Sequence, residues 1–152
     1  MSIQTVRELF AERQFPAEIR ELDAGTETVE RAAAALGVEP ALIAKTLAFK
    51  SPDGGLIAVT RGDARIDNRK FRAAFGIKPR FMDADEVVAA TGHPVGGVCP
   101  FGLAEPLPVY LDTSLRDFAV VYPAAGSPNS HVALKPDEIC ALTGASWVDV
   151  CG

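Results

Sequence analysis

The pattern of apolar residues predicts that the chain begins with two helices. Near the N-terminus, apolar side chains recur at the spacing of three and four residues that places them on one helix face: Ile3, Val6, Leu9 and Phe10. The alanine-rich segment 28–36 ends at Gly37, a residue type that is common just past the end of a helix.

The next part of the chain predicts a short helix followed by a β-hairpin. Pro40 suits the first position of a helix, which is expected to run to Lys45. The apolar segments 46–49 and 56–60 flank the turn-forming residues 52–55, which include two glycines. Two apolar runs joined by such a turn are typical of an antiparallel hairpin.

After the hairpin, helix and strand signals alternate. Asp67 can cap a helix that ends near Gly76, and residues 77–82 then have the pattern of a strand. Asp83 and Glu86 match the capping box that often begins a helix.

The second half of the chain is richer in strands. Short apolar runs separated by turn-forming residues predict strands at 107–111, 118–122, 131–134 and 147–150. Pro136 begins a final helix that stops at Gly144. Strands joined partly by hairpins and partly by helices predict an α/β fold, with a mixed, curved, barrel-like sheet and helices packed around it. Residues 1–152 are expected to form a single domain.

Composition favours a globular protein outside the membrane. Of the 152 residues, 48% are hydrophobic and 23% are charged, a balance that allows one buried core. No run of about 18 or more apolar residues could cross a membrane, and charged and apolar residues alternate in the first segment, unlike a signal peptide. We therefore expect a cytoplasmic protein with no membrane partner.

The cysteines and histidines give little sign of a metal site. Cys99, Cys140 and Cys151 contain no Cys-x-x-Cys pair, and His93 and His131 lie too far apart for a standard zinc pattern. The sequence therefore predicts reduced thiols and no structural metal.

The charge distribution limits what the protein can bind. A net charge of −5 argues against general nucleic-acid binding, because lysine and arginine must neutralise the phosphates. Residues 61–80, however, hold seven basic residues against two acidic ones. This segment could make a local phosphate contact, or it could be a solvated helix face and strand edge.

Two places in the chain carry residues suited to chemistry. Residues 92–102 contain four glycines and two prolines, so this loop can approach a ligand closely and present N–H groups to an oxyanion. An ordinary wide turn is the alternative. Lys45 lies within an apolar stretch and either extends to solvent or points into a cleft to meet an anion such as phosphate.

Cys99 and His131 each have two interpretations. Cys99 could be a nucleophile, but no histidine is its evident partner in the sequence, and a small buried thiol is the commoner outcome. His131 could be a base or a substrate contact, or it could simply be hydrogen-bonded at the start of a strand.

Four motifs, in this order and spacing, carry a resemblance to a known family. They are Lys45-Thr46-Leu47, Gly62-Asp63-Ala64-Arg65-Ile66-Asp67, the loop from Thr91-Gly92 through Gly96-Gly97-Val98-Cys99-Pro100-Phe101-Gly102, and Ala125-Gly126-Ser127-Pro128-Asn129. From about residue 20 to residue 145, the chain resembles the YbaK/prolyl-tRNA-synthetase-associated editing domain family.

The resemblance implies a barrel-like α/β domain that hydrolyses the ester between a mischarged amino acid and the terminal adenosine of transfer RNA (tRNA). Lys45 matches the family lysine, which is expected to hold a backbone phosphate or the terminal nucleotide. Gly96 to Pro100 match the family GxxxP loop, whose backbone groups are expected to surround the ester and position water. No metal and no organic cofactor belong to the pattern.

The expected site combines the lysine and the loop with nearby residues. The catalytic set is Lys45, Gly96, Gly97, Val98, Cys99 and Pro100. The substrate-binding set is Thr46, Phe101, Gly102, Gly126 and His131. The bound partner is then the acceptor end of aminoacyl-tRNA, and a prolyl-tRNA synthetase or an elongation factor could assist its binding.

Other functions stay open at this point. The fold could serve a non-catalytic module that senses uncharged or mischarged tRNA, or a hydrolase of another small ester or amide. The substrate is open between cysteine and other small amino acids on proline tRNA. Where cysteine-clearing relatives tend to read Ser-Gly-Gly, this chain has Ala124-Ala125-Gly126, which favours a small uncharged amino acid such as alanine, serine or 2-aminobutyrate.

Overall fold

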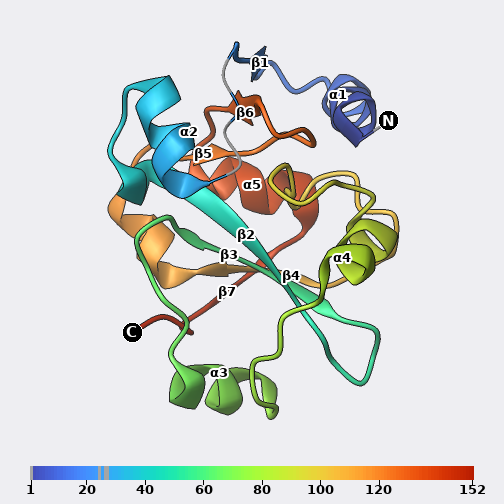
Figure 1. Ribbon diagram of the computed structural model, residues 1–152, viewed down its shortest axis with the longest axis vertical. Coiled ribbons are helices and arrows are strands. Elements are labelled where there is room, and N and C mark those ends of the chain that lie inside the picture. The colour runs from blue at the N-terminus through green and yellow to red at the C-terminus, as the bar shows by residue number, and fades with distance from the viewer. Residues whose placement is uncertain (1, 24, 26–27) are drawn as a thin grey trace.

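The computed structural model describes residues 2–23, 25 and 28–152 (Figure 1). Its helices are α1 (Ser2–Glu12), α2 (Val29–Leu36), α3 (Asn68–Phe75), α4 (Ala84–Thr91) and α5 (Pro136–Thr143), with the 3-10 turns η1 (Pro40–Leu42) and η2 (Thr113–Asp117). Its strands are β1 (Ile19–Glu21), β2 (Ile43–Phe49), β3 (Leu56–Arg61), β4 (Val109–Asp112), β5 (Tyr122–Pro123), β6 (Ser130–Val132) and β7 (Ser146–Val148). None of the described helices is long and apolar enough to cross a membrane.

A five-stranded sheet with the order β5-β2-β3-β4-β7 forms the centre of the structure. The hairpin β2-β3 is antiparallel and the other pairings are parallel, so the sheet is mixed. A second sheet pairs β1 with β6, and the isolated bridges Val121↔Leu134 and Ala124↔His131 connect the two sheets on either side of β5. The predicted α/β class with a mixed sheet is therefore confirmed.

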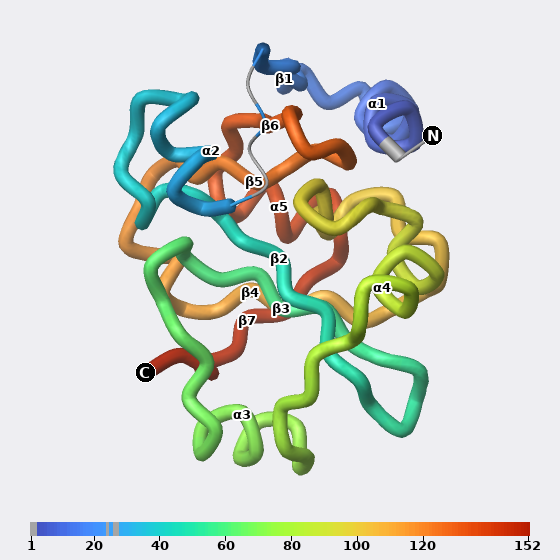
Figure 2. The backbone as a smooth tube through the Cα atoms, viewed as in Figure 1, coloured from blue at the N-terminus to red at the C-terminus, as the bar shows by residue number. Residues whose placement is uncertain are grey.

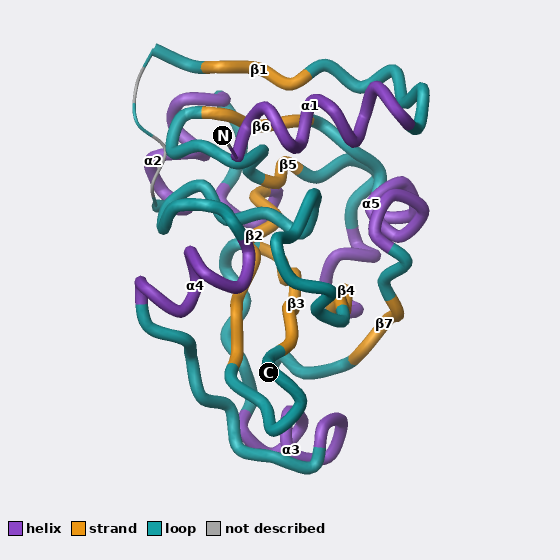
Figure 3. The backbone as a smooth tube through the Cα atoms, turned by 90° about the vertical axis from the view of Figure 1, so that its right-hand side faces the viewer, coloured by secondary structure: helices purple, strands orange, loops and turns teal. Residues whose placement is uncertain are grey.

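The helices lie around the sheets. Figures 1 and 3 show α1 beside β1 and β6 at one end of the structure, and α3 at the opposite end. After α3, the chain runs back along the outer edge of β2, and α4 follows this segment.

Strand β3 is buried on both faces because it lies in the middle of the sheet. Ile57 and Val59 belong to the larger apolar cluster, whereas the alternate residues Leu56 and Ala58 belong to a smaller cluster that contains Phe71 of α3. Side chains alternate between the two faces of a strand, so a single strand contributes to both clusters.

Local signals set the helix ends as predicted. The Asp67 side chain accepts a hydrogen bond from the Lys70 N–H, and Asp83 with Glu86 makes both bonds of a capping box. Glycines in the left-handed conformation, with φ between 71° and 77°, follow four of the helices: Gly37, Gly76, Gly92 and Gly144. Glycine adopts this conformation at no steric cost.

The segment 40–49 folds differently from the prediction. The turn η1 ends at Leu42 and β2 begins at Ile43, so Lys45 lies inside a strand and not at the end of a helix. Residues from Ala44 to Phe49 pair with β3, and this pairing decides the conformation. A pattern within one short segment cannot show such a pairing.

The remaining strands are shorter than predicted. Residues 77–82 form only the isolated bridge Phe81↔Phe49 among the described residues, because β2 ends at Phe49 and the chain turns immediately afterwards, where the Gly54 N–H donates to the Ser51 carbonyl oxygen. The strands expected at 107–111, 118–122, 131–134 and 147–150 correspond to β4, β5, β6 and β7 with shifted bounds. The three-residue strand β1 was not predicted, since its partner β6 is more than a hundred residues away.

The variant Ile57→Ala is expected to lower the free energy of unfolding by about 2–5 kcal/mol, because Ile57 is fully buried and its truncation leaves a cavity. Val88→Ala on α4 is the control, since Val88 is 49% exposed and its truncation should change stability by less than about 0.5 kcal/mol. Urea unfolding followed by circular dichroism measures both effects. Equal losses in the two variants would contradict the central position of β3.

Candidate active site

Among the described residues, the outer edge of β2 is paired at both ends but not in the middle. At one end, β5 pairs with Ile43 and Ala44. At the other end, the Met82 N–H donates to the Ala48 carbonyl oxygen (3.0 Å) and the Lys50 N–H donates to the Arg80 carbonyl oxygen (2.8 Å). The backbone groups of successive residues in a strand point to alternate edges. Thr46 lies two residues before Ala48, so its N–H and C=O groups point to this same outer edge.

A cleft opens beside Thr46. The cleft encloses about 250 Å³, and we call it the β2 cleft. Its lining includes Val29 and Ala32 of α2, Lys45, Thr46 and Ala48 of β2, Phe81, Met82 and Val87, Gly96 and Val98 of the glycine-rich loop, and Ala124 and His131. Figure 2 shows how these segments converge from separate parts of the chain.

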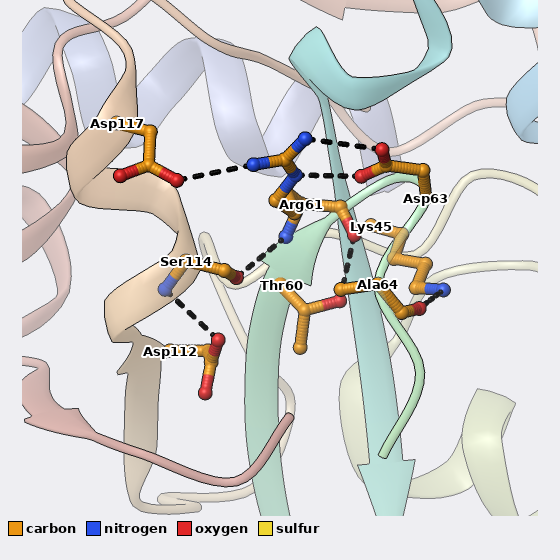
Figure 4. Close-up of polar contacts among 8 residues, drawn as sticks. All are labelled: Lys45, Thr60, Arg61, Asp63, Ala64, Asp112, Ser114 and Asp117. Atoms are coloured by element: carbon orange, nitrogen blue, oxygen red, sulfur yellow. Dashed lines mark hydrogen bonds and ion pairs between the residues drawn. The ribbon is translucent and has the colours of Figure 1, made fainter. Parts of the chain in front are cut away.

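Lys45 lines the cleft and does not extend to solvent. Its half-buried side chain donates a hydrogen bond from Nζ to the Ala64 carbonyl oxygen (Figure 4). Burial lowers the pKa of the Lys45 ammonium, and the negative charge of Asp63 acts in the opposite direction. Arg61 fixes the loop that carries Ala64, because its guanidinium donates to Asp63 (2.6 Å) and to Asp117 (3.1 Å).

The glycine-rich loop forms a wall of the cleft through its backbone. Gly96 and Val98 line the cleft, and Gly96 has a φ of 91°. Gly97 is packed so closely that a Cβ atom there would lie 2.6 Å from the Ser127 carbonyl carbon. The Gly126 N–H donates to the Gly97 carbonyl oxygen (3.1 Å), which ties the loop to the segment before β6.

Among the loop residues that line the cleft, Val95, Gly96 and Val98 have N–H groups without a hydrogen-bond partner in the described part of the chain. The Gly97 N–H donates to the Pro94 carbonyl oxygen (2.9 Å). Fixed, unpaired backbone donors are suited to a carbonyl oxygen that gains negative charge.

The structure separates the predicted site residues into two groups. Lys45, Thr46, Gly96, Val98 and His131 come together at the cleft. In the described part of the chain, the other predicted residues do not line it: Gly97, Cys99, Pro100, Phe101, Gly102 and Gly126. Gly97 and Gly126 instead join the loop to its neighbour, and Cys99 to Phe101 are buried behind it.

The Cys99 thiol has a histidine neighbour that the sequence did not reveal. Its Sγ lies 3.5 Å from Nε2 of His93, and that nitrogen lies 2.6 Å from the Phe101 carbonyl oxygen. Burial raises the pKa of the Cys99 thiol to about 12 and lowers the pKa of the His93 imidazole. The pair is therefore uncharged at neutral pH and packs inside the loop, which is unsuited to nucleophilic attack.

His131 and Thr46 give the cleft uncharged polar groups. His131 is 3% exposed on β6, and burial lowers the pKa of its imidazole to about 4, so the ring is neutral at pH 7. The Thr46 hydroxyl is buried and has no hydrogen-bond partner among the described residues. Both groups can form hydrogen bonds with a ligand without introducing a charge.

Most of the apolar lining was not predicted from the sequence. Val29, Met82 and Val87 come from three different segments, and none belongs to a motif, whereas Ala124 had been noted from its position beside Ala125 and Gly126. The available signal was weak, since apolar residues in helices normally face the core. Among the described residues, no group of three or more His, Cys, Asp or Glu side chains could hold a metal ion.

Comparison with known proteins assigns this geometry to a family. The profile of the aminoacyl-tRNA editing domain matches residues 23–142. The chain belongs to this family. The matched range contains the whole of the β2 cleft lining, from α2 to His131.

Relatives of this editing domain extend over most of the chain. The uncharacterized protein YwhH of Bacillus subtilis (strain 168) is 44% identical over 99% of this chain and 98% of its own length. EbsC of Enterococcus faecalis, named as a candidate Cys-tRNA(Pro)/Cys-tRNA(Cys) deacylase, is 28% identical over 81% of this chain and 76% of its own. A crystal structure of a candidate trans-editing enzyme for prolyl tRNA synthetase superposes with a TM-score of 0.91, at 35% identity, covering 99% of this chain and 97% of that one.

Cys99 of the editing domain is expected to resist alkylation in the folded protein. A pKa of about 12 leaves about a thousandfold less thiolate at pH 8 than the ordinary thiol value of 9.0 would allow, and Cys99 is fully buried. Mass spectrometry after iodoacetamide treatment should find the half-buried Cys140 modified first, and all three cysteines modified in guanidinium. Modification of Cys99 at the rate of Cys140 in the native protein would contradict the inert, buried thiol.

Proposed function

We propose that this editing domain is a free-standing hydrolase that cleaves the ester bond of mischarged aminoacyl-tRNA. The observation that carries the proposal is the β2 cleft, where Lys45, Gly96 and Val98 line one small, mostly apolar space and the N–H groups of Gly96 and Val98 have no hydrogen-bond partner among the described residues. The aminoacylated end of tRNA has a matching set of groups: the phosphate of the terminal nucleotide, the reactive ester carbonyl and the amino-acid side chain.

The loop supplies the electrostatic part of the proposed mechanism. Water attacks the ester carbonyl, whose oxygen becomes an oxyanion. The bond from the carbonyl carbon to the ribose oxygen then breaks, and that oxygen takes the proton lost by the attacking water, which gives the free amino acid and the ribose hydroxyl. Removing one donor from an oxyanion site typically costs about 100- to 1,000-fold in rate. The N–H groups of Gly96 and Val98 are the proposed donors, since the Gly97 N–H is already bonded to Pro94.

Lys45 supplies orientation in the proposed mechanism. Its ammonium stands at the cleft on a side chain held by the Ala64 carbonyl oxygen, where it can bind the phosphate or ribose of the terminal nucleotide. Cys99 has no covalent role, because its thiol is buried behind the loop. His131 and Thr46 are proposed to contact the amino acid, as neutral groups that leave the ester carbonyl to the backbone donors.

The apolar wall suggests a small amino acid on a prolyl-type tRNA. The side chains of Ala44, Ala48, Val98 and Ala124 leave room for a compact group next to Lys45. Alanine, serine and 2-aminobutyrate fit this description, and the prolyl-tRNA connection rests on the crystal structure named above. A prolyl-tRNA synthetase or an elongation factor is proposed to deliver the substrate.

Cysteine is the second candidate, because EbsC is named for cysteinyl-tRNA and matches most of this chain. Cysteine differs from alanine by one sulfur atom and from serine by sulfur in place of oxygen. One methylene-sized group in an apolar pocket is worth only about 1–3 kcal/mol, so overlapping rates among these residues are expected.

Lys45→Ala is expected to reduce the rate of deacylation about a hundredfold or more in a folded protein, because loss of a positioning contact misorients the ester. Release of the labelled amino acid from mischarged tRNA under single-turnover conditions measures this rate. Lys50→Ala is the matched control, since Lys50 lies farther along the same edge, is exposed, and pairs with Glu86 outside the cleft. A Lys45→Ala variant with the native circular dichroism spectrum and the wild-type rate would refute the role of Lys45.

Among alanyl, seryl, cysteinyl and prolyl esters of proline tRNA, the alanyl and seryl esters are expected to be cleared fastest. The prolyl ester should survive, because its ring would have to fit a space that is proposed here to hold a smaller side chain. Side-by-side rates at equal enzyme concentration test this order. A clear preference for the cysteinyl ester would favour the second candidate, and no release from any ester would refute the deacylase.

A further inference from the structure

A second hollow lies next to the β2 cleft and shares part of its lining. It encloses about 340 Å³, and we call it the Phe81 hollow. Lys45, Leu47 and Phe81 line both spaces, so the two are neighbours with the lysine between them. The remaining lining comes from the 61–68 segment and Pro79. The volume lies at the small end of the range for pockets that bind small molecules, about 300–1,000 Å³.

Phe81 presents a fixed aromatic face to this hollow. Its ring is 59% exposed, although a phenylalanine is usually buried. The ring is nevertheless held in place, because it stacks on the fully buried Phe49 with ring centroids 4.7 Å apart and an interplanar angle of 27°. The backbone bridge between the same two residues fixes the position of Phe81 further. An exposed ring with a rigid support is suited to stacking against a flat ligand.

Polar groups around the hollow match a nucleotide. Arg65 and Asn68 line it, and they offer a cation and an amide next to the aromatic face. A third hollow of about 460 Å³ continues from Asn68 and Pro79 and is lined by Arg69, Arg72 and Lys78. The path from the β2 cleft through the Phe81 hollow therefore leads into a basic surface.

These basic side chains are available to phosphates, whereas two others in the same segment are not. Arg61 is neutralised by Asp63 and Asp117, and Lys70 pairs with Asp149. In the part of the chain that the structure describes, no salt bridge holds Arg65, Arg69, Arg72 or Lys78. The unpaired positive charge is thus concentrated beside the Phe81 hollow.

We infer that the Phe81 hollow binds the terminal base of the RNA, with Phe81 as the stacking face. The inference rests on the proposed function, which places the ester in the β2 cleft and the phosphate or ribose at Lys45. The base then extends from Lys45 into the neighbouring hollow, and the preceding phosphates reach the basic side chains. An aromatic face with adjacent cations is the usual platform for a single-stranded base.

The test is binding of the RNA trinucleotide CCA, titrated into ¹⁵N-labelled protein and followed by NMR. Phe81→Leu keeps an apolar contact with Phe49 but lacks a flat ring, and it should raise Kd about tenfold or more. Phe81→Trp restores a ring and should keep Kd within about threefold of the wild type. Val88→Ala is the control, because Val88 is also an exposed apolar residue (49%) and lines neither the β2 cleft nor the Phe81 hollow.

The pattern of the variants separates stacking from a structural role. A general disturbance of the fold would affect Phe81→Trp as much as Phe81→Leu, and a nonspecific effect of removing exposed apolar surface would weaken CCA binding by Val88→Ala as much as by Phe81→Leu. Either of these outcomes overturns the inference. So does equal CCA binding by the wild type and Phe81→Leu, or a failure of the wild type to bind CCA.

The deacylation assay keeps this inference distinct from the proposed function. With mischarged tRNA, Phe81→Leu should lower kcat/KM about tenfold or more, in step with its loss of CCA binding. Wild-type deacylation that Phe81→Leu leaves unchanged refutes the nucleobase site alone. CCA binding through Phe81, without release of amino acid from any mischarged tRNA, refutes the deacylase alone.

Discussion

The unpaired stretch at the outer edge of β2 is the constraint on which the site depends. Buried backbone N–H and C=O groups need partners, so a gap in a sheet edge must be covered by solvent or by a ligand. The gap arises because β5 is only two residues long and pairs with β2 at Ile43 and Ala44 alone among the described residues. The chain then leaves β2 and bridges to β6 at Ala124.

The position of Lys45 depends on residues far from it in the sequence. The loop that carries its acceptor, Ala64, is bonded to the last residues of the chain, since the Gly152 N–H donates to the Arg65 carbonyl oxygen (3.1 Å). The buried carboxylate of Asp112 accepts from the Val150 N–H (2.8 Å), which fixes this last segment on the sheet. A flexible cation is thus held by a rigid network of main-chain bonds.

The sequence predicted features that arise from local interactions. Asp67 and Asp83 cap helices through bonds to residues three positions away, so their role is visible in a short segment. Lys45 is a different case, because its motif indicated the family while its strand was mistaken for a helix end. The conformation at that point follows from pairing with β3 and could not be read from residues 40–45 alone.

The site itself was only partly predictable for the same reason. Gly96 and His131 were identified from motifs, yet the apolar wall comes from segments that meet only in the folded chain. The contact between His93 and Cys99 was also missed, because the five intervening residues must turn back on themselves to create it. The Phe81 hollow was not predicted either, because two motifs, 45–47 and 62–67, meet there with Phe81 and Pro79, which belong to no motif.

The close approach of Gly97 to Ser127 also determines what can vary in the β2 cleft. Main-chain atoms meet there, and the hydrogen bond from Gly126 to Gly97 joins the same two segments. The separation of these two walls is therefore set by backbone contact, independently of any side chain. Differences in cleft volume between such domains must then come from the few side chains that line the space between the walls, such as Val98 and Ala124.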